Sequence, residues 1–310
     1  MTGQRYTVHR HQHHFGWDNA LEPVLEVEPG VAVEFEVVDA SGGQLHRGST
    51  AADVAALDFA RVNPVTGPVF VKGARPGDVL EVEILDFGRT EWGWTAIIPG
   101  FGLLADEFPE PYLKIWDLSG GKAEFAPGIE IPIKPFPGTI GVALPEPGLH
   151  SIVPPRQNGG NMDIRHLTRG ARLFLPVWVE GALFSVGDTH AAQGDGEVCG
   201  TAIEAPMTIT VRFHLHREQS IAEPRYILPG PPTPEADARG YYVTTGFAPD
   251  LLEAARKATR FQIEHLQQAY GLSREEAYVL ASVAVDLRIS EVVDAPNWLV
   301  SAFLPQAIFR

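Results

Sequence analysis

The chain has 310 residues, a formal net charge of −15 and a single cysteine. This length can bury a large core, one cysteine excludes an intrachain disulfide, and so acidic a chain lacks the basic surface that nucleic acid binding requires. Its apolar runs are too short to span a bilayer, and Met1-Thr2-Gly3-Gln4-Arg5 lacks the apolar centre of a secretion signal. We therefore expect a cytoplasmic protein with no nucleic acid or membrane partner.

Extended segments dominate the first part of the chain. Apolar and polar residues alternate over residues 31–38, 79–85 and 208–216, which is typical of half-buried strands. Glycine and proline separate such runs every dozen or so residues. A strongly apolar stretch, Leu173 to Val186, is expected to form a further strand. The pattern predicts a mainly β fold, with antiparallel strands in a sandwich or a barrel.

The last third of the chain has a different pattern. Five prolines from Pro224 to Pro234 form a stiff connection, and apolar residues then follow helical spacing over 251–261. Gly271 is placed to end this helix, and Ser273 with Glu276 forms a capping box for a second one. We predict two parts: a β-rich core over residues 1–223 and a smaller C-terminal α+β module over residues 224–310.

The segment most informative about function is the polar run over residues 187–197, which reads Gly-Asp-Thr-His-Ala-Ala-Gln-Gly-Asp-Gly-Glu. If Asp188 and His190 lie on a strand, they project from the same face, because the strand period is two. A carboxylate beside an imidazole can bind a metal such as zinc. A polar hairpin explains the same composition, so spacing alone leaves both interpretations open.

A second polar loop, Asn158-Gly159-Gly160-Asn161-Met162-Asp163, precedes the same apolar stretch. It offers amide and carboxylate groups beside glycines that can expose backbone N–H groups. An Asn-Gly-Gly-Asn segment is also a common structural loop. The two polar segments could lie together at one end of a sheet or well apart.

Both segments resemble the acetamidase/formamidase family, and the resemblance continues, in order, along nearly the whole chain. It implies hydrolysis of short amides, such as formamide and acetamide, to a carboxylate and ammonia, and it implies a homo-oligomer. Further matching segments are Trp17-Asp18-Asn19, Glu22-Pro23-Val24-Leu25, residues 39–44, Asn63-Pro64-Val65-Thr66-Gly67-Pro68-Val69, residues 72–78, Leu175-Pro176-Val177, Gly181-Ala182-Leu183 and residues 286–294.

Amides resist hydrolysis because the carbonyl is weakly electrophilic and the nitrogen leaves badly unless it is protonated. A divalent metal polarises the carbonyl and activates water, and a carboxylate can move the proton. Zinc suits the mixture of imidazole and carboxylate, and calcium is an alternative at a second, oxygen-rich site. We expect Asp163, Asp188 and His190 to bind the metal and Glu197 to act as the proton shuttle, with Asp188 and Gln193 counted among the catalytic residues. Gln193 is expected to hold the amide, together with the substrate-binding residues Asn158, Gly159, Gly160 and Asn161.

Two alternatives of other classes remain. Cys199 could act as a thiolate nucleophile, although a lone cysteine is usually a small buried apolar residue. The chain could also bind a small amide or urea without hydrolysing it. Asp188, His190 and Glu197 argue against simple binding, because a neutral amide needs hydrogen bonds but no proton shuttle.

Other polar clusters have structural explanations that we prefer. His9, His11 and His13 would share one face of a possible N-terminal strand, and His14 is the best placed of these histidines to join the site. The remaining clusters are Glu36 and Asp39 at a strand end, His214 and His216 on the solvent face of a strand, and a charged helix end over residues 286–294.

Overall fold

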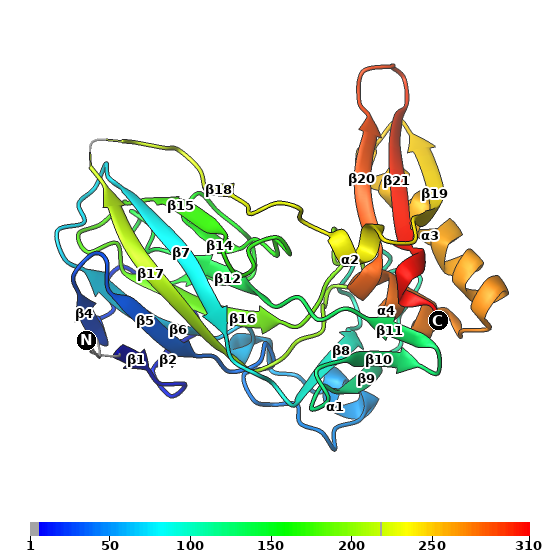
Figure 1. The fold of residues 1–310 in the computed structure, drawn as a ribbon, viewed down its shortest axis with the longest axis horizontal. Coiled ribbons are helices and arrows are strands. Elements are labelled where there is room, and N and C mark those ends of the chain that lie inside the picture. The colour runs from blue at the N-terminus through cyan, green and yellow to red at the C-terminus, as the bar shows by residue number, and fades with distance from the viewer. Residues whose placement is uncertain (1–5, 218) are drawn as a thin grey trace.

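The computed structural model describes residues 6–217 and 219–310, so the segment Met1 to Arg5 lies outside the described residues. Two six-stranded sheets face each other in a β-sandwich (Figure 1). The first has the order β1-β5-β17-β7-β15-β18, and the second has the order β14-β12-β16-β6-β2 with β4 also paired to β6. Pairing is antiparallel except between β1 and β5 and between β4 and β6. The mainly β prediction is confirmed in its sandwich form, and the described strands close no barrel.

The bounds of the sandwich strands are as follows. The first sheet contains β1 (Tyr6–Val8), β5 (Ala32–Glu36), β7 (Val79–Phe87), β15 (Arg172–Pro176), β17 (Thr208–His216) and β18 (Arg225–Ile227). The second contains β2 (His13–His14), β4 (Leu25–Val27), β6 (Val65–Val71), β12 (Phe136–Gly141), β14 (Gly159–Asn161) and β16 (Phe184–His190).

Smaller elements surround the sandwich. Three strand pairs are β3 (Gly16–Trp17) with β13 (His150–Ser151), β8 (Trp92–Ile97) with β9 (Tyr112–Asp117), and β10 (Ala123–Ala126) with β11 (Ile129–Ile131). Short helical segments are α1 (Ala51–Ala55), η1 (Phe59–Arg61), α2 (Pro234–Asp237) and η2 (Gln306–Ile308).

The core of the sandwich follows from the alternation of the predicted strands. Their inward residues are buried, as Phe35 on β5 and Phe213 on β17 show. Both rings lie edge-on to Phe184 of the opposite sheet, with centroid distances of 5.6 and 5.0 Å. Removing a ring of this kind from a core costs about 3–5 kcal/mol of stability. This core fixes β16, the strand that carries Asp188 and His190.

The apolar stretch from Leu173 to Val186 is not one strand, so that prediction is wrong. It supplies β15 to the first sheet and β16 to the second, and the chain crosses between them over residues 177–183. Gly181 makes the crossing with φ of 73°, and a Cβ there would lie 2.1 Å from the Phe70 ring. Asp188 and His190 lie within β16 itself, which is a buried strand. The alternative interpretation of this segment as a polar hairpin is therefore wrong.

The C-terminal region combines two helices with a three-stranded sheet, β19-β21-β20. Gly271 ends α3 with a left-handed φ of 67°, and Ser273 with Glu276 caps α4, as predicted. Residues 286–291 form a strand rather than a charged helix end, so that prediction is wrong; their period-two alternation matches pairing with β21. The bounds are β19 (Tyr241–Ala248), α3 (Leu251–Tyr270), α4 (Arg274–Ala284), β20 (Asp286–Glu291) and β21 (Trp298–Pro305).

Helix α4 packs against the loop that follows β16. The Tyr278 hydroxyl accepts a hydrogen bond from the Leu104 N–H (2.9 Å) and donates one to the Val198 carbonyl. The Ser282 hydroxyl accepts from the Cys199 N–H at 3.1 Å. The C-terminal helices therefore share one apolar core with residues 97–131 and 191–207, while the β19–β21 sheet projects from the body (Figure 1). A domain boundary at residue 223 stays a prediction.

No described helix combines the length and the apolar character that a membrane span requires.

Candidate active site

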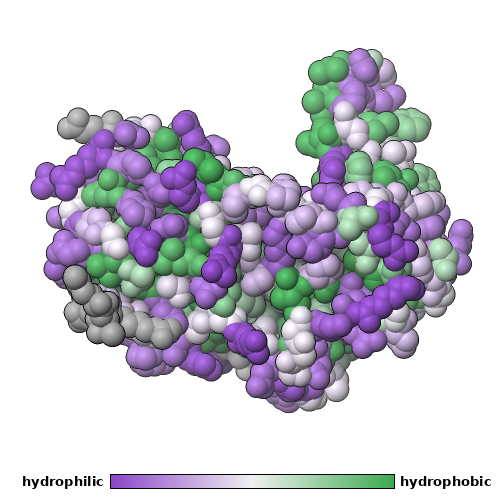
Figure 2. Space-filling model, in the orientation of Figure 1, coloured by the Kyte–Doolittle hydropathy of each residue, from purple (hydrophilic) through white to green (hydrophobic). Residues whose placement is uncertain are grey.

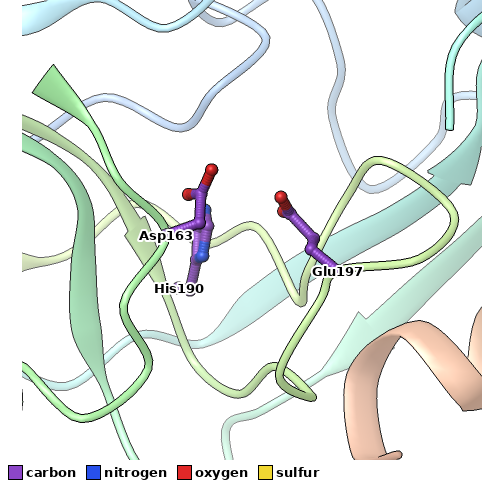
Figure 3. Close-up of side chains that lie close together, drawn as sticks. All are labelled: Asp163, His190 and Glu197. Atoms are coloured by element: carbon purple, nitrogen blue, oxygen red, sulfur yellow. The ribbon is translucent and has the colours of Figure 1, made fainter. Parts of the chain in front are cut away.

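Five ionisable side chains converge where β16 ends. Ligand atoms of Asp163, His190 and Glu197 lie within 4.8 Å of one another, and those of Asp188, His190 and Glu204 form a second group by the same measure. His190 belongs to both groups. Figure 3 shows the Glu197 carboxylate reaching from its loop toward Asp163 and His190. The two polar segments, residues 158–163 and 187–197, therefore meet at the end of β16.

Hydrogen bonding to Gln193 sets the proton position on the His190 ring. The Gln193 amide nitrogen donates to the Asp163 carbonyl at 2.8 Å, so its Oε1 serves as the acceptor 3.0 Å from His190 Nδ1. Nδ1 therefore carries a proton. His190 Nε2 faces Asp188 Oδ1 at 3.1 Å and Glu204 Oε2 at 3.0 Å. In the neutral ring, Nε2 is the nitrogen whose lone pair is left to bind a cation.

Amide and hydroxyl groups hold the other side of Asp188. Its Oδ2 lies 3.2 Å from Asn63 Nδ2 and 3.2 Å from Thr139 Oγ1. The same two groups contact Asn161 Oδ1, at 3.3 Å and 2.6 Å respectively. These contacts join Asn161 to the carboxylate cluster and restrict the rotation of Asp188.

Backbone strain is concentrated in this cluster. Asn63, Asp163, Asp188 and Glu197 have positive φ values of 48°, 50°, 53° and 42°. Such left-handed conformations cost non-glycine residues of order 1–3 kcal/mol each and tend to occur where a side chain has to be aimed. The strain supports a functional rather than a purely structural role for the cluster.

The cluster carries more negative charge than its single imidazole can offset. Burial, assisted by the charge of Asp188, raises the pKa of Asp163 to about 6 and that of Glu204 to about 7. Burial and the neighbouring Asp163 raise the pKa of Glu197 well above its ordinary value. Burial opposes ionisation of Asp188 too, but the charge of His190 together with hydrogen bonds from His190, Glu204 and Thr139 outweighs it, so the pKa of Asp188 is lowered. Burial likewise opposes the charged form of His190, and the Glu204 and Asp188 carboxylates overcome it, so its pKa is raised.

The donor set fits a divalent cation. Asp163 Oδ1 is buried without a hydrogen-bond partner among the described residues. Glu204 Oε2, although 3.0 Å from His190 Nε2, likewise makes no well-oriented hydrogen bond within the described structure. Buried carboxylate oxygens without donors are costly unless a cation binds them. Imidazole and carboxylate ligands together suit zinc, and the excess of oxygen also suits calcium.

A cavity of about 500 Å³ opens onto the cluster. Its lining combines polar site residues with apolar residues from three other parts of the chain. A bound molecule would therefore touch the carboxylates and an apolar wall at the same time. The polar lining includes Asn63, Asn161, Asp163, Asp188, Glu197 and Glu204.

The remaining predicted amide-binding residues lie elsewhere. The Asn158 side chain donates to the Val142 carbonyl at 2.7 Å, and the Gly159 N–H donates to the Arg156 carbonyl at 3.0 Å. Gly160 pairs with Ile140 in the sheet. None of Asn158, Gly159 and Gly160 is among the described residues that line the cavity. Gln193 also lies outside this lining and contacts the site through His190.

Sequence reasoning missed Glu204, Asn63 and Thr139. Glu204 interrupts an otherwise apolar stretch, Ala202-Ile203-Glu204-Ala205, and a carboxylate in such a stretch is rarely buried without a partner. That signal could have identified Glu204. Thr139 carries no comparable signal, and Asn63 begins a segment that matches the family but gives no sign of its role.

Cys199 is buried behind the cavity rather than in its described lining. Its sulfur lies 3.4 Å from the Ala96 carbonyl and 3.5 Å from Thr201 Oγ1. Burial raises the pKa of the thiol, which disfavours the nucleophilic thiolate. The geometry favours the structural interpretation of this cysteine.

Asp39 and Glu36 have structural partners. Asp39 Oδ1 accepts hydrogen bonds from the Ser41 N–H and from the Trp94 indole, each at 3.0 Å, and so positions two residues of the cavity lining. Glu36 accepts from the Arg10 N–H at 3.3 Å, away from that lining.

The remaining histidines also lie apart from the cluster. The chain turns after His9, where the Gln12 N–H donates to the His9 carbonyl at 2.8 Å, so His9, His11 and His13 do not share the face of one strand, and the possible strand is not formed. His214 and His216 are partly exposed on β17 and face Glu83 and Glu81, as expected for its solvent side.

His14 is a structural histidine whose burial has a testable consequence. Its ring contacts the Gly16 carbonyl at 2.7 Å and the Ser185 hydroxyl at 2.9 Å, and burial lowers its pKa below 6.5. Below that pH the unfolded chain takes up the proton first, so this histidine makes the folded state less stable as pH falls. We expect the His14→Gln variant to lose less stability than the parent protein between about pH 7.5 and about pH 5.5 in urea unfolding. Equal losses in both proteins would contradict this account.

The site therefore combines several carboxylates and one imidazole in a candidate cation centre beside a cavity. The model of the Acetamidase/Formamidase family matches residues 2–152 and 146–310. Formamidase from Methylophilus methylotrophus is 30% identical, with 96% of this chain and 90% of the relative covered. The gamma lactamase of Delftia acidovorans has a TM-score of 0.89 at 31% identity, covering 96% of this chain and 89% of that one. Acetamidase from Bacillus halodurans has a TM-score of 0.69 at 32% identity, with 96% of each chain covered.

The chain therefore belongs to the acetamidase/formamidase family, as the sequence motifs indicated.

Proposed function

We propose that this protein hydrolyses short linear amides to a carboxylate and ammonia by means of a water activated at a divalent cation. One observation carries the proposal: four carboxylates, two of them buried and two half-buried, converge on a single buried imidazole beside a cavity. Family membership and the formamidase and acetamidase relatives support amide hydrolysis independently. Simple amide binding would need no such concentration of ionisable groups.

Asp163, Asp188 and His190 are the proposed ligands of this cation, and zinc is the proposed metal. Glu204, which is grouped with Asp188 and His190 and whose Oε2 has no hydrogen-bond partner among the described residues, is proposed as a further ligand. Gln193 holds the His190 ring in the tautomer that leaves Nε2 available. Calcium is proposed only as a second, oxygen-bound ion. When bound, the cation would polarise the amide carbonyl and lower the pKa of a water molecule.

Glu197 is the proposed proton shuttle. Its carboxylate lines the cavity beside Asp163 and His190, and its raised pKa makes the ionised form a stronger proton acceptor than an ordinary glutamate. Glu197 would take the proton of the attacking water and deliver it to the amide nitrogen, so that ammonia can leave. Asn161, which lines the same cavity, is placed to hydrogen-bond the amide.

The test is ammonia release from formamide, acetamide and propionamide before and after chelation. We expect activity to disappear when metal is removed and to return when zinc is added back. Cys199→Ala is the control variant, and it should keep parental activity. Activity that resists chelation but is lost in Cys199→Ala would contradict the proposal, and amide binding with metal present but no ammonia release would favour a binding protein.

A cyclic amide is a second candidate substrate. The TM-score of 0.89 with the gamma lactamase, against 0.69 with the acetamidase, favours including it. The five-membered lactam 2-pyrrolidinone therefore belongs in the same assay, with ring opening measured by chromatography. No ring opening by metal-loaded enzyme that releases ammonia from acetamide would exclude this candidate.

We also propose that the protein forms a homo-oligomer through the face of the β19–β21 sheet that α3 leaves uncovered. Thr244 and Gly246 contact α3, so the alternate residues Val243 and Phe247 lie on the opposite face of the sheet, although the Lys257 ammonium of α3 reaches to 5.5 Å from the centroid of the Phe247 ring. Phe247 is 61% exposed, and Figure 2 shows apolar side chains along this projecting sheet. Monomers rarely expose contiguous apolar patches of this kind.

Light scattering tests the oligomer. We expect a mass of at least two chains for the parent protein and a smaller mass for Phe247→Glu, because a carboxylate would be buried in the interface. A parent protein that is monomeric at assay concentrations would contradict the proposal.

A further inference from the structure

We infer that the active-site cavity accepts amides with a bulky apolar acyl group, and that such amides are better substrates than formamide or acetamide. The inference rests on the proposed amide hydrolysis and specifies its substrate class. Three observations support it: the size of the cavity, the composition of its wall, and the position of two exposed phenylalanines.

The cavity is much larger than a short amide. Acetamide has four heavy atoms and would fill about 120 Å³, taking about 30 Å³ for each water-sized group. The cavity measures about 500 Å³, within the range of about 300–1,000 Å³ typical of sites that bind drug-sized ligands. A short amide at the carboxylates would leave most of this volume to water.

Most of the lining outside the carboxylate cluster is apolar, although Ser41 and Thr201 also belong to it. The apolar side chains come from the α1–η1 region, from the segment after β8 and from the loop after β13, so three separate parts of the chain contribute to one surface. Contact between this surface and an apolar acyl group stabilises the bound substrate, whereas contact with ammonia would not. The residues are Leu57, Phe59, Val62, Ile98, Phe101 and Val153.

Two of these residues, Phe59 and Phe101, have large aromatic rings that are not packed in the protein core. Phe59 is 53% exposed and Phe101 is 39% exposed, although both line the cavity. Phe101 lies against Gly200, where a Cβ would be 2.5 Å from its ring. Gly200 lies in the loop between Glu197 and Glu204, so the apolar wall directly contacts the segment that carries two of the site carboxylates.

This arrangement indicates how an amide substrate would lie in the cavity. Its C–N bond has to reach the carboxylates and His190, and the leaving nitrogen is small. The acyl group is then the part that can occupy the apolar side of the cavity. Each methylene buried there should raise kcat/KM about fourfold, until the cavity is filled.

Steady-state ammonia release by the metal-loaded, full-length enzyme tests the inference. The substrates are formamide, acetamide, butyramide, hexanamide and phenylacetamide. We expect kcat/KM to rise through the series, with phenylacetamide at least tenfold above acetamide. A decline from acetamide onward would overturn the inference and leave the proposed function intact, and no hydrolysis of any amide would overturn both.

Variants of the two rings show whether this wall is responsible. Phe59→Ala and Phe101→Ala should each lower the ratio of kcat/KM for phenylacetamide to that for acetamide by at least about fivefold. Phe261→Ala is the matched control, because Phe261 is a 48% exposed phenylalanine on α3. The ratio should not change in the control. An unchanged ratio in both cavity variants would overturn the assignment of the acyl group to this wall.

Discussion

Replacing Glu197 by glutamine lowers ammonia release by about 10²–10⁴-fold, the usual contribution of a positioned general acid or base. Glutamine keeps the size and the hydrogen-bonding capacity of the side chain but cannot take up a proton from water. Glu197 is half-buried at positive φ beside Asp163 and His190, so its backbone fixes its position, and a base from solvent would not be held there. We therefore expect the loss in kcat, with KM changed much less.

The amount of bound metal distinguishes a proton shuttle from a metal ligand. Glu197→Gln should keep the parental metal content, whereas Asp188→Asn should lower both metal content and activity. Glu180→Gln, at an exposed glutamate in the crossing between β15 and β16, is the control for the charge change. If Glu197→Gln loses metal in parallel with activity, Glu197 is a ligand and the proton is moved by another group. Parental turnover in both Asp188→Asn and Glu197→Gln would contradict the whole assignment.

Local sequence signals predicted the regular elements well. Alternation identified β5, β7 and β17, and the Gly271 and Ser273–Glu276 signals marked the junction of α3 and α4. These signals succeed because each depends on neighbours a few residues away. Asp286-Leu287-Arg288-Ile289 shows the same alternation. Because this segment follows a helix, it was predicted to be a charged helix end, whereas it forms β20.

The candidate site was only partly predictable, because its geometry depends on contacts between distant parts of the chain. Asp188 and His190 share a strand face, which the period of two predicts. Their meeting with Asp163 requires the pairing of β12 with both β14 and β16, and Glu204 reaches His190 through a bridge outside the regular strands. No local pattern encodes such pairings. The prediction of one strand from Leu173 to Val186 was wrong for a related reason: the apolar character of a segment shows that it is buried, but not which sheet it joins.

Gly138→Ala should abolish most of the activity without unfolding the protein. Gly138 lies on β12 between the strands that carry the site, and its carbonyl accepts hydrogen bonds from the N–H groups of Met162 (3.1 Å) and Asp163 (3.2 Å). A Cβ at this position would lie 2.6 Å from Asp163 Oδ1, 2.8 Å from Asp188 Oδ2 and 2.8 Å from His190 Cε1. Carbon and oxygen atoms do not approach so closely, so the added methyl group has to displace at least two of the proposed metal ligands.

Displacing these side chains should strongly reduce the rate of catalysis, because a misplacement of about 1 Å can lower the rate by about 10²-fold. Gly138 does not have a left-handed φ, so alanine is compatible with its backbone. Overpacking should cost about 1–3 kcal/mol of stability, so thermal unfolding should shift by a few degrees while the protein stays folded. Gly120→Ala is the matched control, since a Cβ there meets nothing within 4 Å. We expect Gly138→Ala to lose at least about 10²-fold in kcat/KM together with bound metal, and Gly120→Ala to lose neither. Parental activity in Gly138→Ala would show that the reacting groups are not those that surround this glycine.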